Sequence, residues 1–229
     1  MIRTYRRFPQ DRFRDRHEAG RRLAERVLPL VAPRNTVVLA LPRGGVPVGY
    51  EVARRLGAPL DVLLVRKLGV PWQPELAFGA VATGGVVVLN EDHVRALGIP
   101  ADVVEDVIER ERLELERRER LYRDDHEPLD VEGKTVVVVD DGIATGSTVR
   151  AALASLAERG VARRIVASPV AAAETVHGLE DEADEVVCLK TPISFTAVGA
   201  WYEDFTPVSD AEVKHLLGRA ASEIPQSVD

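Results

Sequence analysis

Cysteine, methionine and aromatic residues are scarce in this 229-residue chain: it has one cysteine and one methionine, and aromatic residues make up 5% of it. A single cysteine, Cys188, excludes an internal disulfide, and the five histidines lack the spacing of a zinc site. No run approaches the roughly 18 apolar residues that a membrane-spanning helix needs, and no apolar stretch of a signal peptide follows the basic first residues. We therefore expect a cytoplasmic protein without a membrane contact.

Positive charge is also in short supply, because 30 Lys and Arg residues face 37 Asp and Glu residues, for a net charge of -7. Affinity for nucleic acid comes from surplus Lys and Arg, so we expect no nucleic-acid partner. One exception lies between Met1 and Arg26, where nine arginines face four acids. These arginines either attract an anion or coat the solvent face of a first helix, and the second interpretation is favoured. The arginines assigned to that face are Arg12, Arg14, Arg16, Arg21 and Arg22.

Short aliphatic runs alternate with helical patterns along most of the chain. The expected strands are residues 36–41, 60–65, 135–139, 164–170 and 185–189, and the expected helices are residues 15–31, 46–56, 101–123, 146–159 and 172–180. Strands that read as unbroken Val, Ile and Leu runs between helices are typical of a parallel sheet covered on both faces. We predict a doubly wound, mostly parallel α/β fold in a single domain, 1–229, with its core at about 15–190.

Three segments depart from this alternation. Residues 68–84 are rich in glycine and proline and precede a hairpin strand at 86–89, so we expect a flexible loop there. From residue 191 onward the alternation stops, and residues 191–229, with a last helix near 210–219, are expected to form a small C-terminal hood over the sheet. The highly charged helix at 101–123 is compatible with packing on a partner subunit in a homodimer or on its own sheet.

The chemistry is concentrated just after the strand at 135–139. Ligands of an open α/β sheet bind outside the carboxyl ends of its strands, and Asp140 and Asp141 stand at such an end. Burying two carboxylates costs solvation free energy unless something uses them, and the cis-diol of a ribose can donate hydrogen bonds to both. Small residues then let backbone N–H groups converge on a helix start, where an anion is favoured. The predicted phosphate loop comprises Gly142, Ile143, Ala144, Thr145, Gly146, Ser147 and Thr148.

The segment DDGIATGST resembles the phosphoribosyl-pyrophosphate (PRPP) motif of the type I phosphoribosyltransferases. Two other nucleotide-binding motifs do not fit. A Walker P-loop needs a lysine where Gly146 stands, and the GxGxxG pattern of dinucleotide sites is absent. A chance strand-turn-helix with capping Thr and Ser side chains is the remaining alternative.

Two further loops extend the resemblance to most of residues 36–192. The turn after the first strand resembles the family's pyrophosphate loop, and Arg66 to Gly84 has the position of its flexible loop, where Arg66 and Lys67 would meet pyrophosphate. A plain turn and solvated strand-end charges are the alternatives left open for these loops. The whole chain looks most like a group of uncharacterised, predicted phosphoribosyltransferases. The residues of the turn are Pro42, Arg43, Gly44 and Gly45.

The resemblance implies transfer of a 5-phosphoribosyl group from PRPP to a nitrogenous base or related acceptor, with release of pyrophosphate. Mg²⁺ would be carried by the phosphates of PRPP, with no direct metal site on the protein. The catalytic residues would be Arg43, Lys67, Asp140 and Asp141. The alternative is a regulator that binds PRPP, or a catalytically idle relative of the same fold.

The acceptor is unassigned, because Ala144 stands where family members that act on 6-oxopurines place an acid. Lys190 resembles the lysine that reads an exocyclic oxygen in those enzymes, although a solvated strand end is the more common role of such a lysine. Trp201 and Tyr202 either stack on a base or form the core of the hood, since flat rings suit both.

Overall fold

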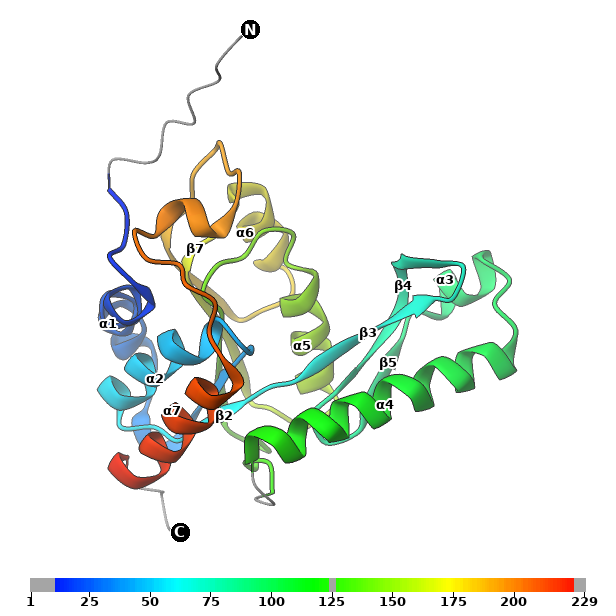
Figure 1. Ribbon diagram of the computed structural model, residues 1–229, viewed down its shortest axis with the longest axis horizontal. Coiled ribbons are helices and arrows are strands. Elements are labelled where there is room, and N and C mark those ends of the chain that lie inside the picture. Colours follow the sequence, from blue (N-terminus) through cyan, green and yellow to red (C-terminus); the bar gives the residue numbers. More distant parts are fainter. Residues whose placement is uncertain (1–10, 124–126, 225–229) are drawn as a thin grey trace, which may run out of the picture.

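A five-stranded parallel sheet forms the centre of the computed structural model, which describes residues 11–123 and 127–224 apart from the side chains of residues 74 and 75. The strand order is β2-β1-β6-β7-β8, so β1 lies beside β6 although the two strands are far apart in the sequence (Figure 1). The predicted α/β class with a mostly parallel sheet is confirmed. The strands are β1 (Thr36–Ala40), β2 (Leu60–Val62), β6 (Thr135–Val139), β7 (Arg163–Val170) and β8 (Glu185–Lys190).

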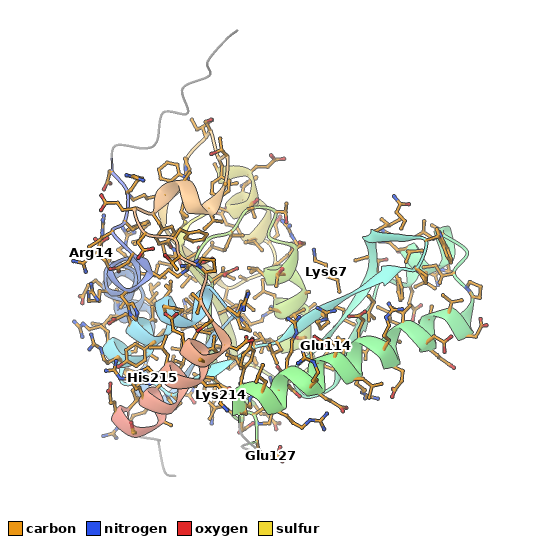
Figure 2. All side chains as sticks on the ribbon, viewed as in Figure 1. Arg14, Lys67, Glu114, Glu127, Lys214 and His215 are labelled. Carbon is orange, nitrogen blue, oxygen red and sulfur yellow. The ribbon has the colours of Figure 1, made fainter. Side chains whose placement is uncertain are left out.

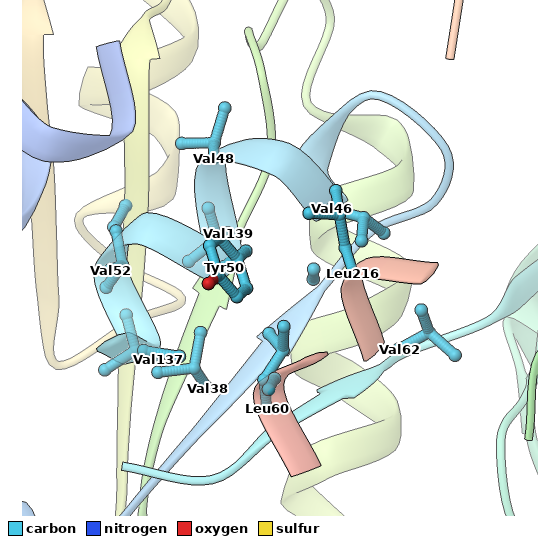
Figure 3. Close-up of a cluster of buried hydrophobic side chains, with 14 of the residues drawn as sticks. Val38, Val46, Val48, Tyr50, Val52, Leu60, Val62, Val137, Val139 and Leu216 are labelled. Atoms are coloured by element: carbon cyan, nitrogen blue, oxygen red, sulfur yellow. The ribbon is translucent and has the colours of Figure 1, made fainter. Parts of the chain in front are cut away.

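Helices cover both faces of this sheet (Figure 1). Successive residues of each strand point to opposite faces, so each strand contributes to two core clusters. Val38 and Val137 lie in one core cluster with α1, α2 and α7, part of which Figure 3 shows, while Val37 and Val138 lie in the cluster under α5 and α6. No helix in the described part of the chain combines the length and apolar character needed to cross a membrane. The covering helices are α1 (Arg16–Val27), α2 (Gly45–Leu56), α5 (Ser147–Ala157), α6 (Ala173–Leu179) and α7 (Asp210–Glu223).

Residues 65–123 form an arm that projects from the main sheet (Figure 1). The arm has its own buried cluster, which includes Leu68, Phe78 and Val107. The long charged helix α4 packs on β3 and β4 of this arm and on α7, so it lies on the sheet of its own chain, one of its two predicted placements. The elements of the arm are β3 (Val65–Val70), β4 (Gln73–Ala82), β5 (Val86–Leu89), α3 (Glu91–Ala96) and α4 (Ala101–Arg123).

The prediction of a loop at residues 68–84 is wrong, because most of this segment is strand. β3 and β4 pair in an antiparallel sheet, and the glycines that suggested a loop serve this pairing. Gly69 lies at a shift in the strand register, and a Cβ on Gly79 would come within 2.5 Å of the Val88 carbonyl oxygen. The strand expected at 60–65 is also shorter, because β2 ends at Val62 and the chain then leaves the main sheet.

A buried ion pair ties the end of the arm to the main sheet. The Arg123 Nε donates to both carboxylate oxygens of Asp61, at 3.0 and 3.1 Å, and its Nη2 donates to the Val62 carbonyl at 2.6 Å. The two side chains are only 5% and 9% exposed. The Leu129 backbone N–H also donates to Asp61. The chain therefore returns from α4 to β6 at a position that this pair determines.

We expect Arg123→Leu to lower the free energy of unfolding by about 3 kcal/mol, because it leaves the Asp61 carboxylate buried without its partner. Urea unfolding followed by circular dichroism measures the change. Arg120→Leu on the exposed side of the same helix is the matched control, with an expected loss below about 0.5 kcal/mol. Equal losses in the two variants would contradict a structural role for the ion pair.

Candidate functional site

The carboxyl ends of β1 and β6 lie side by side, with Ala40 opposite Val139, so the loops that follow them meet. Asp140 and Asp141 come directly after β6, and the Asp141 backbone N–H donates to the Asp140 carboxylate at 2.8 Å. Burial, together with the neighbouring Asp141 charge, raises the pKa of Asp140 well above its usual range. The acidic pair therefore lies at the edge of the sheet where ligands of such folds bind.

Arg16 of α1 is the partner of this acidic pair. Its Nε donates to the Asp141 Oδ2 at 2.7 Å, and the two side chains are only 9% and 13% exposed. Its Nη1 donates to the Thr206 carbonyl at 2.9 Å, and its guanidinium lies 3.9 Å from the centre of the Phe205 ring. The pair thus joins the first helix, the site and the C-terminal segment.

The prediction that Arg16 lies on the solvent face of the first helix is wrong. Arg16 shares the buried face of α1 with Ala19, Gly20 and Leu23, which follow it at the 3, 4 and 7 spacing of one helix face. This spacing is visible in the sequence and could have identified an arginine that points inward. Arg14 precedes α1 and keeps a largely exposed side chain, while the side chains of Arg21 and Arg22 on α1 are about half-exposed.

The phosphate loop is anchored near its start, at Ile143, and its later backbone N–H groups are unbonded within the described part of the chain. The Ile143 N–H donates to the Val170 carbonyl at 2.9 Å, and the Ile143 carbonyl accepts from the Ala172 N–H at 3.0 Å. Gly146 adopts a φ of +72°, a left-handed conformation that favours glycine, and no side chain caps α5. Among the described residues, the backbone N–H groups of residues 144–148 make no hydrogen bond. They are therefore available to an anion at the start of α5.

The turn at residues 42–45 packs directly on the acidic pair. A Cβ on Gly44 would lie 2.0 Å from the Asp141 Oδ2, and a Cβ on Gly45 would lie 2.6 Å from the Val139 carbonyl oxygen. Only residues without a side chain permit this approach. The Arg43 side chain is half-exposed and lies 3.8 Å from Asp210 of α7. The structure thus brings the predicted pyrophosphate turn and the acidic pair together.

The arm delivers Lys67 to the phosphate loop. The Lys67 Nζ donates to the Ser147 Oγ at 2.7 Å, and Figure 2 shows this side chain reaching from β3 toward α5. The Ser147 Oγ also lies 3.1 Å from the Thr145 Oγ1. Arg66, the preceding residue of β3, points to the other side, where its Nη2 pairs with Glu111 of α4 at 2.7 Å. The structure therefore places Lys67 at the phosphate loop and Arg66 against α4, and the predicted contact of both residues with pyrophosphate stays a prediction.

A family model described as the phosphoribosyl transferase domain matches residues 72–204, which include the acidic pair and the whole phosphate loop. The chain belongs to this family. The resemblance of DDGIATGST to the PRPP motif of type I phosphoribosyltransferases is thereby confirmed at the level of the family.

Several relatives of this chain agree with the assignment to the family. Two proteins of Mycobacterium tuberculosis, whose names assign them provisionally to the phosphoribosyl transferases, are 49% identical over 208 residues, 91% of this chain. The match covers 47% of each, so the chain spans about half the length of these curated relatives. A bifunctional protein PyrR of Chloroflexus aurantiacus is 34% identical over 125 residues, covering 54% of this chain and 63% of that protein.

The crystal structure of the protein TT1426 from Thermus thermophilus is similar to most of this chain. It is 47% identical, covers 90% of this chain and 97% of that one, and has a TM-score of 0.82. The same fold is therefore present in an experimentally determined relative.

The structure does not support the prediction that Tyr202 stacks on a base. Its ring is 1% exposed, its hydroxyl donates to the Asp141 carbonyl at 2.6 Å, and its ring centre lies 5.6 Å from that of Phe13 and 5.1 Å from that of Phe205. Burial raises the pKa of the Tyr202 hydroxyl above its usual range. Tyr202 therefore belongs to the core of the hood, and its hydroxyl holds the backbone of Asp141 in place.

Lys190 and Trp201 lie in the same region of the chain, around Phe13. The Lys190 ammonium pairs with the Asp11 carboxylate at 2.8 Å and lies 4.5 Å from the centre of the Phe13 ring, so it is not a solvated strand end. Trp201 stays partly exposed, and its carbonyl accepts from the Phe13 N–H at 2.9 Å. The C-terminal segment is also divided, because α7 packs on α2 and α4, away from this aromatic cluster.

We expect Arg16→Gln to lower the free energy of unfolding by about 3 kcal/mol at neutral pH, because it leaves the Asp141 carboxylate buried without an opposite charge. Arg14→Gln, which removes an exposed arginine two residues away, should cost less than about 1 kcal/mol. Urea unfolding of the two variants beside the parent measures both values. A loss in Arg16→Gln no larger than that in Arg14→Gln would contradict the role assigned to the buried pair.

Proposed function

We propose that the chain transfers a 5-phosphoribosyl group from PRPP to a nitrogenous acceptor and releases pyrophosphate. The observation that carries the proposal is the phosphate loop, in which the unused backbone N–H groups of residues 144–148 follow an acidic pair made of the buried Asp141 and the partly buried Asp140. An anion-binding helix start next to carboxylates suits a sugar phosphate, because such a molecule presents a phosphate and hydroxyl donors together.

The acidic pair would hold the ribose. Burial raises the pKa of Asp141, and the Arg16 guanidinium opposes this effect by stabilising the ionised carboxylate. Burial and the Asp141 charge raise the pKa of Asp140, which disfavours its ionised form. A ribose hydroxyl that donates a hydrogen bond to this carboxylate would stabilise the ionised form. The two hydroxyls of the cis-diol would donate to these carboxylates, and the 5-phosphate would accept from the N–H groups of residues 144–148.

Transfer breaks the bond between the anomeric carbon and a pyrophosphate oxygen, and a bond from the acceptor nitrogen to that carbon replaces it. The pyrophosphate leaves with the electron pair, and the acceptor nitrogen loses a proton. Positive charge develops on the sugar and negative charge on the leaving group, so positioned cations stabilise the transition state. Lys67 from the arm and Arg43 from the turn are the proposed cations.

The acidic pair also fits the Mg²⁺ that family members use with PRPP. Such an ion is commonly held by one or two carboxylates together with substrate phosphates. The described residues contain no group of three or more His, Cys, Asp or Glu side chains placed to hold a metal. We therefore propose that the oxygens of PRPP carry the ion to the site, where the acidic pair would lie beside it. When bound, Mg²⁺ would neutralise charge on the pyrophosphate oxygens.

Calorimetric titration with PRPP and Mg²⁺ tests the donor. We expect binding to the parent chain and at least about a ten-fold loss of affinity in Asp141→Asn, because the variant removes the charge that accepts from the ribose. Asp130→Asn, on an exposed loop, should bind like the parent. No heat with the parent chain, or equal affinity in Asp141→Asn, would refute the proposal.

Release of pyrophosphate with a panel of bases separates an enzyme from a PRPP-binding regulator. With the accepted base, Lys67→Gln should lower kcat roughly 100-fold, because it removes a cation from the transition state. Lys134→Gln, remote in sequence and paired with Asp130, should leave kcat unchanged. PRPP binding without release of pyrophosphate for any base would favour the regulator.

A further inference from the structure

A hollow of about 250 Å³ opens beside the turn at residues 42–45 and is lined by polar and charged side chains. Three of them are arginines: Arg43 of the turn, and Arg117 and Arg118 of α4. Tyr122 of α4 and Asp210 of α7 complete the charged part of its wall. We call it the arginine hollow. It lies outside the acidic pair and the phosphate loop. Its wall comes from the arm and from the body, by which we mean the main sheet and the helices that cover it.

The arginines keep unused donors. Glu114 accepts from the Arg117 Nε and Nη2 at 2.7 and 3.0 Å and from the Arg118 Nε at 2.8 Å, and these contacts lower the pKa of Glu114 to about 2. Within the described residues, neither Nη group of Arg118 makes a hydrogen bond. Among the same residues, the Arg43 guanidinium makes no hydrogen bond. Its Nη1 lies 3.8 Å from the Asp210 Oδ1, which is beyond hydrogen-bonding distance.

The one acid in the wall is already engaged. The Tyr122 hydroxyl donates to the Asp210 Oδ1 at 2.6 Å, and burial together with this contact raises the pKa of Tyr122 to about 12. The hydroxyl therefore keeps its proton and remains a donor at neutral pH. The wall holds three guanidinium charges and one carboxylate, and Glu114, outside the wall, pairs with two of the arginines. The hollow therefore has surplus positive charge in a chain whose net charge is -7.

We propose that the arginine hollow is a binding site for a small phosphate-class anion. Planar guanidinium groups match the geometry of phosphate oxygens, which accept from two N–H groups at once. The volume suits phosphate or pyrophosphate, because it is below the roughly 300 Å³ at which pockets for larger organic ligands begin. An incoming anion would take Arg43 from its long contact with Asp210.

The anion has two sources. It is either the pyrophosphoryl end of the sugar donor, since Arg43 belongs to the turn beside the acidic pair, or a free phosphate or pyrophosphate. The first source rests on the proposed function, and the second does not. In both cases the anion would bind between α4 of the arm and the turn of the body, and would hold them together.

Calorimetric titration with inorganic pyrophosphate, and separately with inorganic phosphate, tests the hollow. We expect Arg118→Gln and Arg117→Gln each to weaken the binding of pyrophosphate about ten-fold, because each removes a charged donor. Arg120→Gln, an equal change of charge on the exposed side of α4, is the matched control and should bind like the parent.

The outcomes separate this proposal from the proposed function. Equal affinity in Arg117→Gln, Arg118→Gln and Arg120→Gln, or no binding of either anion to the parent chain, would overturn the hollow as a site. A parallel loss of PRPP affinity in Arg118→Gln assigns the hollow to the donor's pyrophosphoryl end, and an unchanged PRPP affinity assigns it to a free anion. Pyrophosphate binding that depends on Arg118, in a chain that binds no PRPP, would support the hollow and refute the proposed function.

Discussion

The buried ion pair between Arg16 and Asp141 joins three parts of the chain that lie far apart in sequence. Arg16 belongs to the first helix, Asp141 follows the central strand β6, and the Thr206 carbonyl and the Phe205 ring belong to the C-terminal segment. A carboxylate buried at the end of a strand needs an opposite charge, and this one comes from a helix that is distant in the sequence. The site can therefore form only when the first helix and the C-terminal segment are in place.

The order of the strands supplies the second constraint. Because β1 and β6 are neighbours in register, the glycine turn and the acidic pair leave the sheet at the same edge. Gly44 then approaches Asp141 more closely than any side chain would permit. Two loops that are distant in the sequence thus form one surface, and the absence of side chains at the turn matters as much as the charges beside it.

The sequence predicted the central sheet well, because buried parallel strands are continuous aliphatic runs and their helices have a clear period. It also located Asp140, Asp141 and the phosphate loop, since they follow a strand directly. The arm was harder to predict. Glycines such as Gly69 and Gly79 suggest a loop in the sequence. In the structure Gly69 lies at a register shift and Gly79 lets the Val88 carbonyl come close, which only the partner strands reveal. The burial of Tyr202 likewise depends on Phe13 and Phe205, contacts between distant segments that no local pattern contains.

The alternation of Lys67 and Arg66 along β3 has a mechanical consequence. One side chain reaches Ser147 at the start of α5, and its neighbour, on the opposite face, is held by Glu111 of α4. The strand is thus fastened on both faces, to the body through one residue and to the arm helix through the other. A twist of β3 about its own axis would strain both contacts at once, so the position of the arm is mechanically linked to the Ser147 side chain at the start of α5.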